Sequence, residues 1–276
     1  MVSNACDPGF TPEVNAMLAA LLPGVEAALT DNLVGVYLRG SLALGDFDPA
    51  TSDIDFLVVT ERPVAEAEFA ALAVLHARLA ALPNKYADHL EGSYIPRAAV
   101  ERFRPDERRH PTVGADWTFQ YGEHRDGWIL ERWTVRERGV ILRGPDPKTL
   151  IDPITPDAIC QAVRVCLREW TEWMARPDGL QFVTPRSHQA FAAETMCRAL
   201  YTLAHSRGAL PTKPRAVAWA RETLPEPWRS LVEQSRTWRT DTTPNPASMP
   251  TILRFVRWAA AEGGATASSS DQHDER

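Results

Sequence analysis

Val34–Thr60 has the sequence VGVYLRGSLALGDFDPATSDIDFLVVT, in which two apolar runs enclose a polar segment. The first run predicts a strand, and a second strand is predicted to begin at Asp53-Ile54-Asp55. Because side chains alternate along a strand, Asp53 and Asp55 are expected on one face, about 7 Å apart at their Cα atoms, with Ile54 turned into the core. The sequence therefore places two carboxylates at the mouth of a buried strand.

Paired acids inside an apolar run favour a metal site over an ordinary turn. Hard divalent cations such as Mg²⁺ take oxygen ligands and commonly use one or two carboxylates together with substrate phosphates. Gly40 lets backbone amides approach an anion, and Ser41 can donate its hydroxyl. Turn chemistry explains Asp46 and Asp48 but gives no reason for acids within a strand. We therefore expect a phosphate to bridge this loop and a bound metal.

Gly40-Ser41, followed twelve positions after the serine by Asp53-Ile54-Asp55 and an apolar run, resembles the signature of the DNA polymerase β-like nucleotidyltransferase superfamily. The resemblance implies that the two aspartates hold Mg²⁺. It also implies that Gly40, Ser41 and Ser52 contact a nucleotide. A third carboxylate is implied on the strand that follows the next helix.

Glu91 occupies the place of that third carboxylate. The segment Asp88–Ile95 predicts a half-buried strand, because Leu90 is apolar between polar neighbours. A carboxylate on this strand would reach both the metal and an acceptor hydroxyl, so we expect Glu91 to be a metal ligand and the general base. The alternatives are that Glu91 is an exposed strand residue or that Asp88 is the base.

Composition restricts the partners of the chain. A formal net charge of −6 over 276 residues argues against a general nucleic-acid binder and suits a cationic small substrate. No apolar run approaches the roughly 20 residues that span a bilayer, and the N-terminus lacks the pattern of a signal peptide. The four cysteines lack zinc-site spacing. We expect a cytoplasmic monomer without a membrane or nucleic-acid partner.

Hydrophobic spacing predicts two domains and a tail. Residues 1–150 are expected to form an α/β (α+β) domain with a small mixed sheet, containing helices from Thr11-Pro12, over Val64–Leu82 and over Trp128–Arg138, and a last strand at Val140–Leu142. Residues 96–122 show only weak periodicity. Residues 151–263 predict an all-α bundle, and residues 264–276 a disordered tail. The five helices expected in the bundle are 156–176, 187–207, 214–223, 226–238 and 248–262.

The helical domain carries a second resemblance. The sequence CRALYTL from Cys197, then Gly208, Pro211-Thr212-Lys213 and Ala218-Trp219-Ala220, looks like the C-terminal domain of aminoglycoside adenylyltransferases, which put AMP on a hydroxyl of streptomycin or spectinomycin. In those enzymes an acid at the start of the preceding helix helps to hold the drug. Here that helix opens Ser187-His188-Gln189 without an acid.

Two further residues are assigned to the nucleotide. Lys213 lies in a loop that opens a helix, from which a long cation can reach a triphosphate; an ordinary solvated lysine is the alternative. Asp126 stands before the helix that begins at Trp128, where it is either a helix cap or a contact to a ribose or an ammonium group.

The sequence thus predicts an enzyme that transfers AMP from ATP to a hydroxyl of a small cationic acceptor, foremost an aminoglycoside. ATP and two Mg²⁺ ions are expected at Ser41, Asp53 and Asp55, with Glu91 as base. One alternative is the same chemistry on a protein hydroxyl or an RNA end. The other is a nucleotide-binding regulatory module that has lost catalysis.

Overall fold

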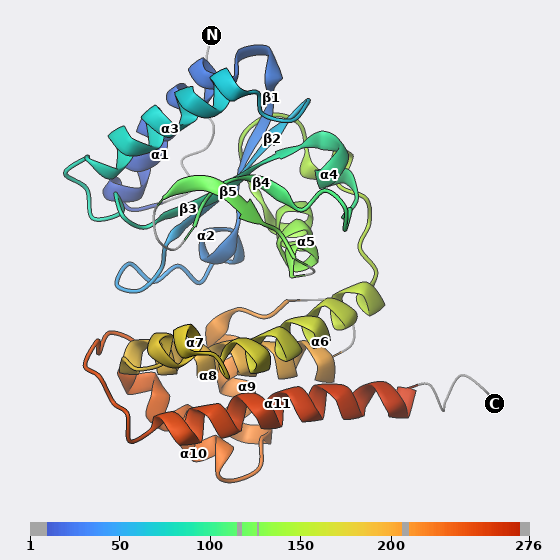
Figure 1. The fold of residues 1–276 in the computed structure, drawn as a ribbon. Helices are drawn as coiled ribbons and strands as arrows, with labels where there is room; N and C mark the ends of the chain where they lie inside the picture. The colour runs from blue at the N-terminus through green and yellow to red at the C-terminus, as the bar shows by residue number, and fades with distance from the viewer. Residues whose placement is uncertain (1–9, 115–117, 126, 206–209, 271–276) are drawn as a thin grey trace. The chain divides into compact units, whose positions relative to one another are not determined.

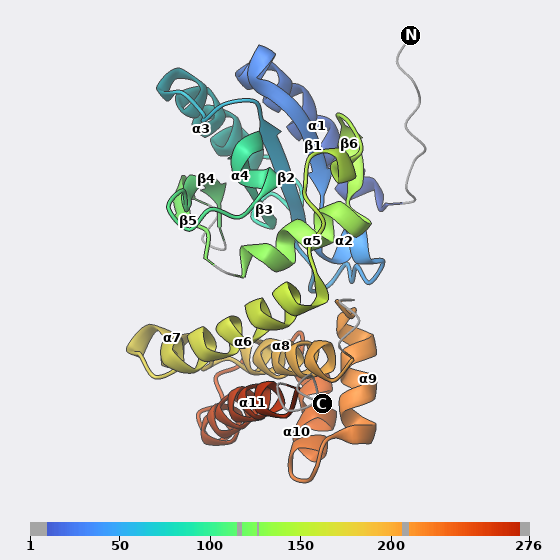
Figure 2. The same ribbon diagram turned by 90° about the vertical axis from the view of Figure 1, so that its right-hand side faces the viewer.

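The computed structural model describes residues 10–114, 118–125, 127–205 and 210–270. The chain divides into two compact units, Met1–Pro153 and Ile154–Arg276. Figures 1 and 2 show a sheet with helices in the first unit and a group of helices in the second. None of the described helices has the length and apolar composition needed to cross a membrane.

A mixed sheet forms the centre of the first unit, with the strand order β5-β4-β3-β2-β1-β6. Only β2 and β3 are parallel, and the other neighbouring strands pair antiparallel. The small mixed sheet expected from the sequence is therefore confirmed. Its strands are β1 Leu33–Leu38, β2 Ile54–Thr60, β3 Leu90–Pro96, β4 Arg109–Val113, β5 Phe119–Glu123 and β6 Val140–Arg143.

Two helices supply much of the core that supports this sheet. α1 (Pro12–Leu29) begins where the Thr11 hydroxyl accepts a hydrogen bond from the Val14 amide at 3.4 Å, with proline in the first turn. α3 (Glu66–Ala80) connects β2 to β3 and packs beside α1. Buried leucine and valine side chains of both helices join those of β1 and β2 in one cluster. This cluster holds the ends of the central strands in place.

In the described residues of the second unit, the regular elements are helices, and the one β feature is an isolated bridge between Pro185 and Pro244. α8 packs against four of its neighbours, α6, α9, α10 and α11. The predicted all-α bundle is confirmed. Its helices are α6 Pro156–Trp173, α7 Pro177–Phe182, α8 Arg186–Ala204, α9 Lys213–Thr223, α10 Trp228–Ser235 and α11 Met249–Ser270.

The structure differs from the sequence prediction in both units. α4 (Arg97–Glu101) and the β4–β5 hairpin occupy the segment with weak periodicity, where Pro111 within β4 obscures a strand pattern. β3 is buried along its length except at Glu91, rather than half-buried, because it lies between β2 and β4.

In the second unit, two further differences concern helix ends. The short helix α7 lies between two of the predicted helices and was not expected; it begins at Pro177, because proline is tolerated at a first helical position. α11 continues to Ser270, although disorder is predicted from residue 264. Its extension is anchored at Gly263, whose carbonyl accepts a hydrogen bond from Arg164 Nε at 3.1 Å and which packs near Leu167.

One buried histidine in the first unit makes a pH-dependent contribution to stability. His76 on α3 is 5% exposed, stacks on Phe56 and shares a 2.7 Å hydrogen bond with the Tyr94 hydroxyl. Burial lowers the pKa of His76 to about 4 from an ordinary value near 6.5. Because the unfolded chain binds the proton more readily, this part of the stability is present above pH 6.5 and is lost between pH 6.5 and about 4.

We predict that His76→Gln, which keeps a polar atom near Tyr94, reduces the acid sensitivity of the fold. Between pH 7.5 and 5, the wild type should lose about 2 kcal/mol more free energy of unfolding than the variant. Urea denaturation at both pH values measures this difference, and the remaining buried histidines contribute equally to both proteins. Equal losses would show that folding does not lower the pKa of His76.

Candidate active site

The loop after β1 is shaped by a glycine that lies against Asp55. The Arg39 amide donates a hydrogen bond to the Asp55 carbonyl at 2.9 Å, which continues the β1–β2 pairing to the strand end. Gly40 then adopts a φ of +59° and starts the short helix α2 (Gly40–Leu44). A Cβ atom at Gly40 would stand 2.0 Å from Asp55 Oδ2. The glycine therefore provides both the left-handed conformation and the space for the carboxylate.

Parallel pairing of β2 and β3 places Asp55 and Glu91 directly beside each other in register. Equivalent positions on neighbouring parallel strands carry their side chains on the same face of the sheet. Burial is the largest cause that raises the pKa of Glu91 to about 7, and the negative charges of Asp55 and Asp53 raise it further, while Arg39 opposes the shift. The structure thus brings these two predicted site residues together and leaves Asp88 outside the strand.

Asp53 is held separately from Asp55. It precedes β2, which begins at Ile54 rather than at Asp53, and its Oδ1 lies 2.7 Å from His89 Nδ1. The other ring nitrogen of His89 is 3.6 Å from Asp88, whose side chain is 70% exposed. The Ile54 amide also donates to the His89 carbonyl at 2.7 Å. His89 therefore links the segment before β2 to the segment before β3, and sequence reasoning missed it.

Sequence reasoning also missed an ion-pair network at the same strand ends. Arg39 Nη1 lies 3.1 Å from Asp55 Oδ1 and donates a 2.7 Å hydrogen bond to Glu131 Oε2 on α5 (Trp128–Arg138). The predicted bounds of α5 are confirmed. The position of Arg39, directly before Gly40 at the end of an apolar strand, could have indicated a role at the site. Nothing in the sequence pointed to Glu131, because it lies 92 residues away on a helix with many charged residues.

Of the residues assigned to the nucleotide, three have local structural roles. The Ser41 carbonyl accepts the amides of Gly45 and Asp46 at the end of α2. The Ser52 hydroxyl accepts the Asp48 amide at 3.0 Å, which closes the turn before Asp53. Lys213 is the first residue of α9, and its Nζ lies 5.4 Å from the centre of the Phe191 ring.

The last assigned residue, Asp126, lies outside the described residues, and the described N-cap of α5 is Gly127.

The carboxylates fit a divalent cation by their chemistry and by their electrostatics. They are oxygen donors of the kind that Mg²⁺ prefers. Burial is the largest cause of the raised pKa of Glu91, and the negative charges of Asp55 and Asp53 add to it, so acids gather at this strand end. In the described part of the chain, no three His, Cys, Asp or Glu side chains already converge as a ligand set. Asp53 is directed to His89 and Asp55 to Arg39. A metal would therefore bind carboxylates that already have a partner at one oxygen.

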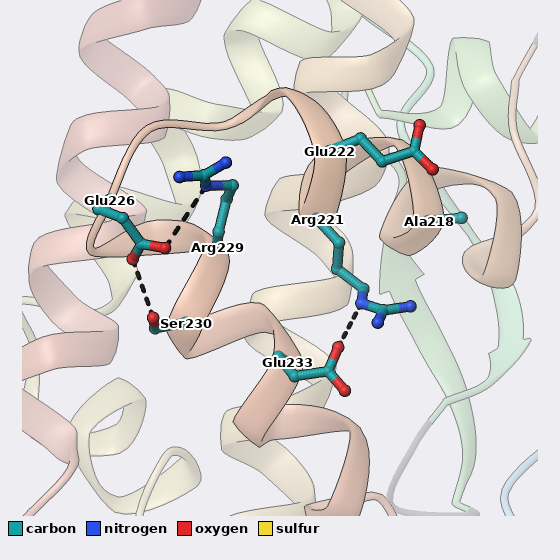
Figure 3. Close-up of a pocket in the computed structure, with 7 residues that line it drawn as sticks. All are labelled: Ala218, Arg221, Glu222, Glu226, Arg229, Ser230 and Glu233. Carbon is teal, nitrogen blue, oxygen red and sulfur yellow. Dashed lines mark hydrogen bonds and ion pairs between the residues drawn. The ribbon is translucent and has the colours of Figure 1, made fainter.

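A separate pocket of about 440 Å³ lies on the second unit, between α9 and α10. Figure 3 shows ion pairs from Arg221 to Glu233 and from Arg229 to Glu226, and Ser230 also bonds to Glu226 at 2.9 Å. The Arg221–Glu233 pair joins the two helices, whereas the contacts of Glu226 stay within the start of α10 and the loop before it. The pocket contains none of the residues that the sequence assigns to a site.

Comparison with known families covers both units. Residues 25–109 match the nucleotidyltransferase domain family, and residues 149–261 match the family described as aminoglycoside adenylyltransferase, C-terminal domain. The chain is an aminoglycoside adenylyltransferase-like nucleotidyltransferase. The first match contains Asp53, Asp55 and Glu91, so the carboxylates at the strand ends belong to the nucleotidyltransferase domain.

A solved structure supports the same fold for this nucleotidyltransferase. The crystal structure of spectinomycin adenyltransferase AAD(9) from Enterococcus faecialis, with ATP and spectinomycin, matches with a TM-score of 0.71 at 14% sequence identity. The match covers 91% of this chain and 99% of that chain. A search of curated proteins found no match.

The helix that lacks the expected acid in this nucleotidyltransferase is α8. His188, near its start, donates a 2.7 Å hydrogen bond from Nδ1 to the Phe182 carbonyl and stacks on the Phe182 ring. Glu194, the acid further along the helix, is buried and paired with Arg239 at 3.0 Å. Both side chains thus have partners within the second unit.

We predict that Gly40→Ala abolishes most nucleotidyl transfer, because the added methyl group displaces the Asp55 carboxylate. Gly45→Ala is the matched control, since Gly45 also has a positive φ (+78°) but has no atom within 4 Å of a built Cβ. Each variant should lose about 1–2 kcal/mol of stability through backbone strain. Only Gly40→Ala should lose ~100-fold in turnover, as expected for an error of about 1 Å in a catalytic group. Thermal melting and a turnover assay distinguish the two effects.

Proposed function

We propose that this enzyme transfers AMP from ATP to a hydroxyl group of a small cationic acceptor, foremost an aminoglycoside. The observation that carries the proposal is the register of β2 and β3, which sets Asp55 beside Glu91 within a nucleotidyltransferase domain. The match of the second unit to the C-terminal domain of aminoglycoside adenylyltransferases supports the class of acceptor. ATP is supported as the donor by the related solved structure, which contains ATP.

In the proposed mechanism, Glu91 takes the proton from the acceptor hydroxyl. The hydroxyl oxygen then attacks the α-phosphorus of ATP in line, the bond to the β-phosphate oxygen breaks, and pyrophosphate leaves. Mg²⁺ ions bound by Asp53, Asp55 and Glu91 would neutralise charge on the phosphates and on the attacking oxygen. In the metal-free chain Glu91 has a pKa of about 7, so it takes up a proton more readily than an ordinary glutamate, which supports the choice of this carboxylate as the base.

The remaining assigned residues are proposed to hold the nucleotide. Gly40 and Ser41 lie at the turn next to Asp55, where a backbone amide and a hydroxyl can approach a phosphate. The Ser52 hydroxyl accepts one hydrogen bond from Asp48 and keeps its own proton for donation. Lys213 and Asp126 stay predictions as contacts of the triphosphate and the ribose.

The direct test is transfer of labelled AMP from ATP, with Mg²⁺, to a panel that includes spectinomycin and streptomycin. We expect a labelled drug and pyrophosphate in equal amounts, and neither product with Asp53→Asn, which removes a metal charge outside the packed core. Pyrophosphate release on a non-drug acceptor alone would keep the chemistry and reject the aminoglycoside. Tight ATP binding with no transfer to any acceptor would favour a regulatory module.

Glu91→Gln tests the base. This change keeps the size of the side chain but removes the proton acceptor, so turnover should fall by about 10²–10⁴-fold. Affinity for a non-hydrolysable ATP analogue, measured by calorimetry, should change by less than about tenfold, because the hydrogen-bonding capacity of the side chain is largely kept. Asp88→Asn is the control and should retain turnover. The reverse pattern would make Asp88 the base, and wild-type turnover in both variants would place the base elsewhere.

A further inference from the structure

Arg39 is a cation enclosed by acids at the proposed metal site. Its side chain is only 14% exposed, and a single terminal nitrogen, Nη1, serves both Asp55 and Glu131. The Nε atom is buried and has no hydrogen-bond partner among the described residues. An arginine that is optimally paired with one carboxylate usually binds it through two parallel hydrogen bonds. Arg39 therefore shares its ion pairing between Asp55 and Glu131 and forms no bidentate pair with either.

The charge around Arg39 exceeds what one guanidinium can neutralise. Burial by itself would lower the pKa of Arg39, but the negative charges of Glu131, then Asp55 and then Glu91 together raise it above its ordinary value. Asp53 adds to the same negative field, since its charge also raises the pKa of Glu91. The strand end consequently remains negative with Arg39 in place. It can accept more positive charge.

The position of Glu131 provides an alternative partner for Arg39. Glu131 lies on α5, whereas Asp55 lies on β2, and Nη1 is closer to Glu131 (2.7 Å) than to Asp55 (3.1 Å). A small rotation of the guanidinium could release Asp55 without leaving Arg39 unpaired. This matters because a buried charge that loses its only partner costs several kcal/mol.

We propose that Arg39 is an internal counter-cation: it neutralises Asp55 in the metal-free chain and passes to Glu131 when a divalent cation binds Asp55. The inference rests on the proposed function, since it requires a metal at Asp55. Arg39 acts through Asp55 and not on the substrate, so it is a positioning residue. It keeps the carboxylates from repelling one another before the metal arrives, and it opposes metal binding by charge repulsion.

The test compares Arg39→Met, Arg39→Lys and Glu131→Gln, with Arg132→Met as the matched control. Arg132 is a second buried arginine of this unit, but it donates to the carbonyl groups of Val100 and Glu101 and not to the proposed ligands. The readouts are the melting temperature in EDTA and in Mg²⁺, and Mn²⁺ affinity from titrations followed by electron paramagnetic resonance. Neither readout depends on turnover.

Removing the cation should weaken the metal-free fold and strengthen metal binding. Arg39→Met should melt lower in EDTA, recover more than the wild type on addition of Mg²⁺, and bind Mn²⁺ about tenfold tighter, because a unit charge a few ångströms from the ion is removed. Arg39→Lys should stay near the wild-type affinity. Glu131→Gln should bind Mn²⁺ several-fold more weakly, because Arg39 then has only Asp55 as a close partner.

The control separates this role from a purely structural one. Arg132→Met should lower the melting temperature equally in EDTA and Mg²⁺. If Arg39→Met behaves in the same way and its Mn²⁺ affinity is unchanged, Arg39 is only a structural ion pair and the inference is overturned while the proposed function stands. If the wild type binds no Mn²⁺ at millimolar concentration, the proposed metal site fails, and the inference fails with it.

Discussion

The parallel pairing of β2 with β3 is the constraint on which the site depends. It is the single parallel contact in the described sheet, and it sets Asp55 beside Glu91. A parallel pair needs a crossover, which α3 provides by packing with α1 over the buried side chains of the strands. A register slip of one residue would turn Glu91 to the opposite face, so the hydrophobic core fixes the relative position of the two acids.

Concentrating acids at a partly buried strand end has an electrostatic cost, which the surrounding chain offsets. Burial and the neighbouring aspartates make ionisation of Glu91 unfavourable, and its pKa rises accordingly. Arg39 opposes this effect, and Glu131 on α5 holds Arg39 in place. The last α-helix of the first unit therefore contributes to the charge balance of the carboxylates at the ends of earlier strands.

The sequence predicted what depends on local pattern and missed what depends on tertiary contacts. Paired aspartates in an apolar run, together with Gly40, were sufficient to locate the strand end, and alternation placed Glu91 on the following strand. The hydrogen bond from Arg39 to Glu131 joins residues that are 92 positions apart, and the hydrophobic spacing of a sequence does not predict contacts between residues so far apart. The strand that contains Pro111 and the helix that begins at Pro177 were not predicted, because proline weakens a strand or helix pattern. Pro177 stands at a first helical position, and Pro111 pairs with Tyr121 of β5 just outside the residues of β4 that pair with β3, so both prolines are tolerated.

Attraction of a cationic acceptor need not depend on α8. Near the start of that helix His188 bonds to the Phe182 carbonyl. The acid further along, Glu194, is buried and paired with Arg239, so its carboxylate is not accessible. The strand ends of the first unit, by contrast, carry several acids, of which Asp53 and Asp88 are substantially exposed. Such a field favours a cation of any shape. The carboxylates that we propose for the chemistry can thus also attract a positively charged acceptor. The choice among such acceptors must then come from shape and hydrogen-bonding contacts elsewhere in the chain.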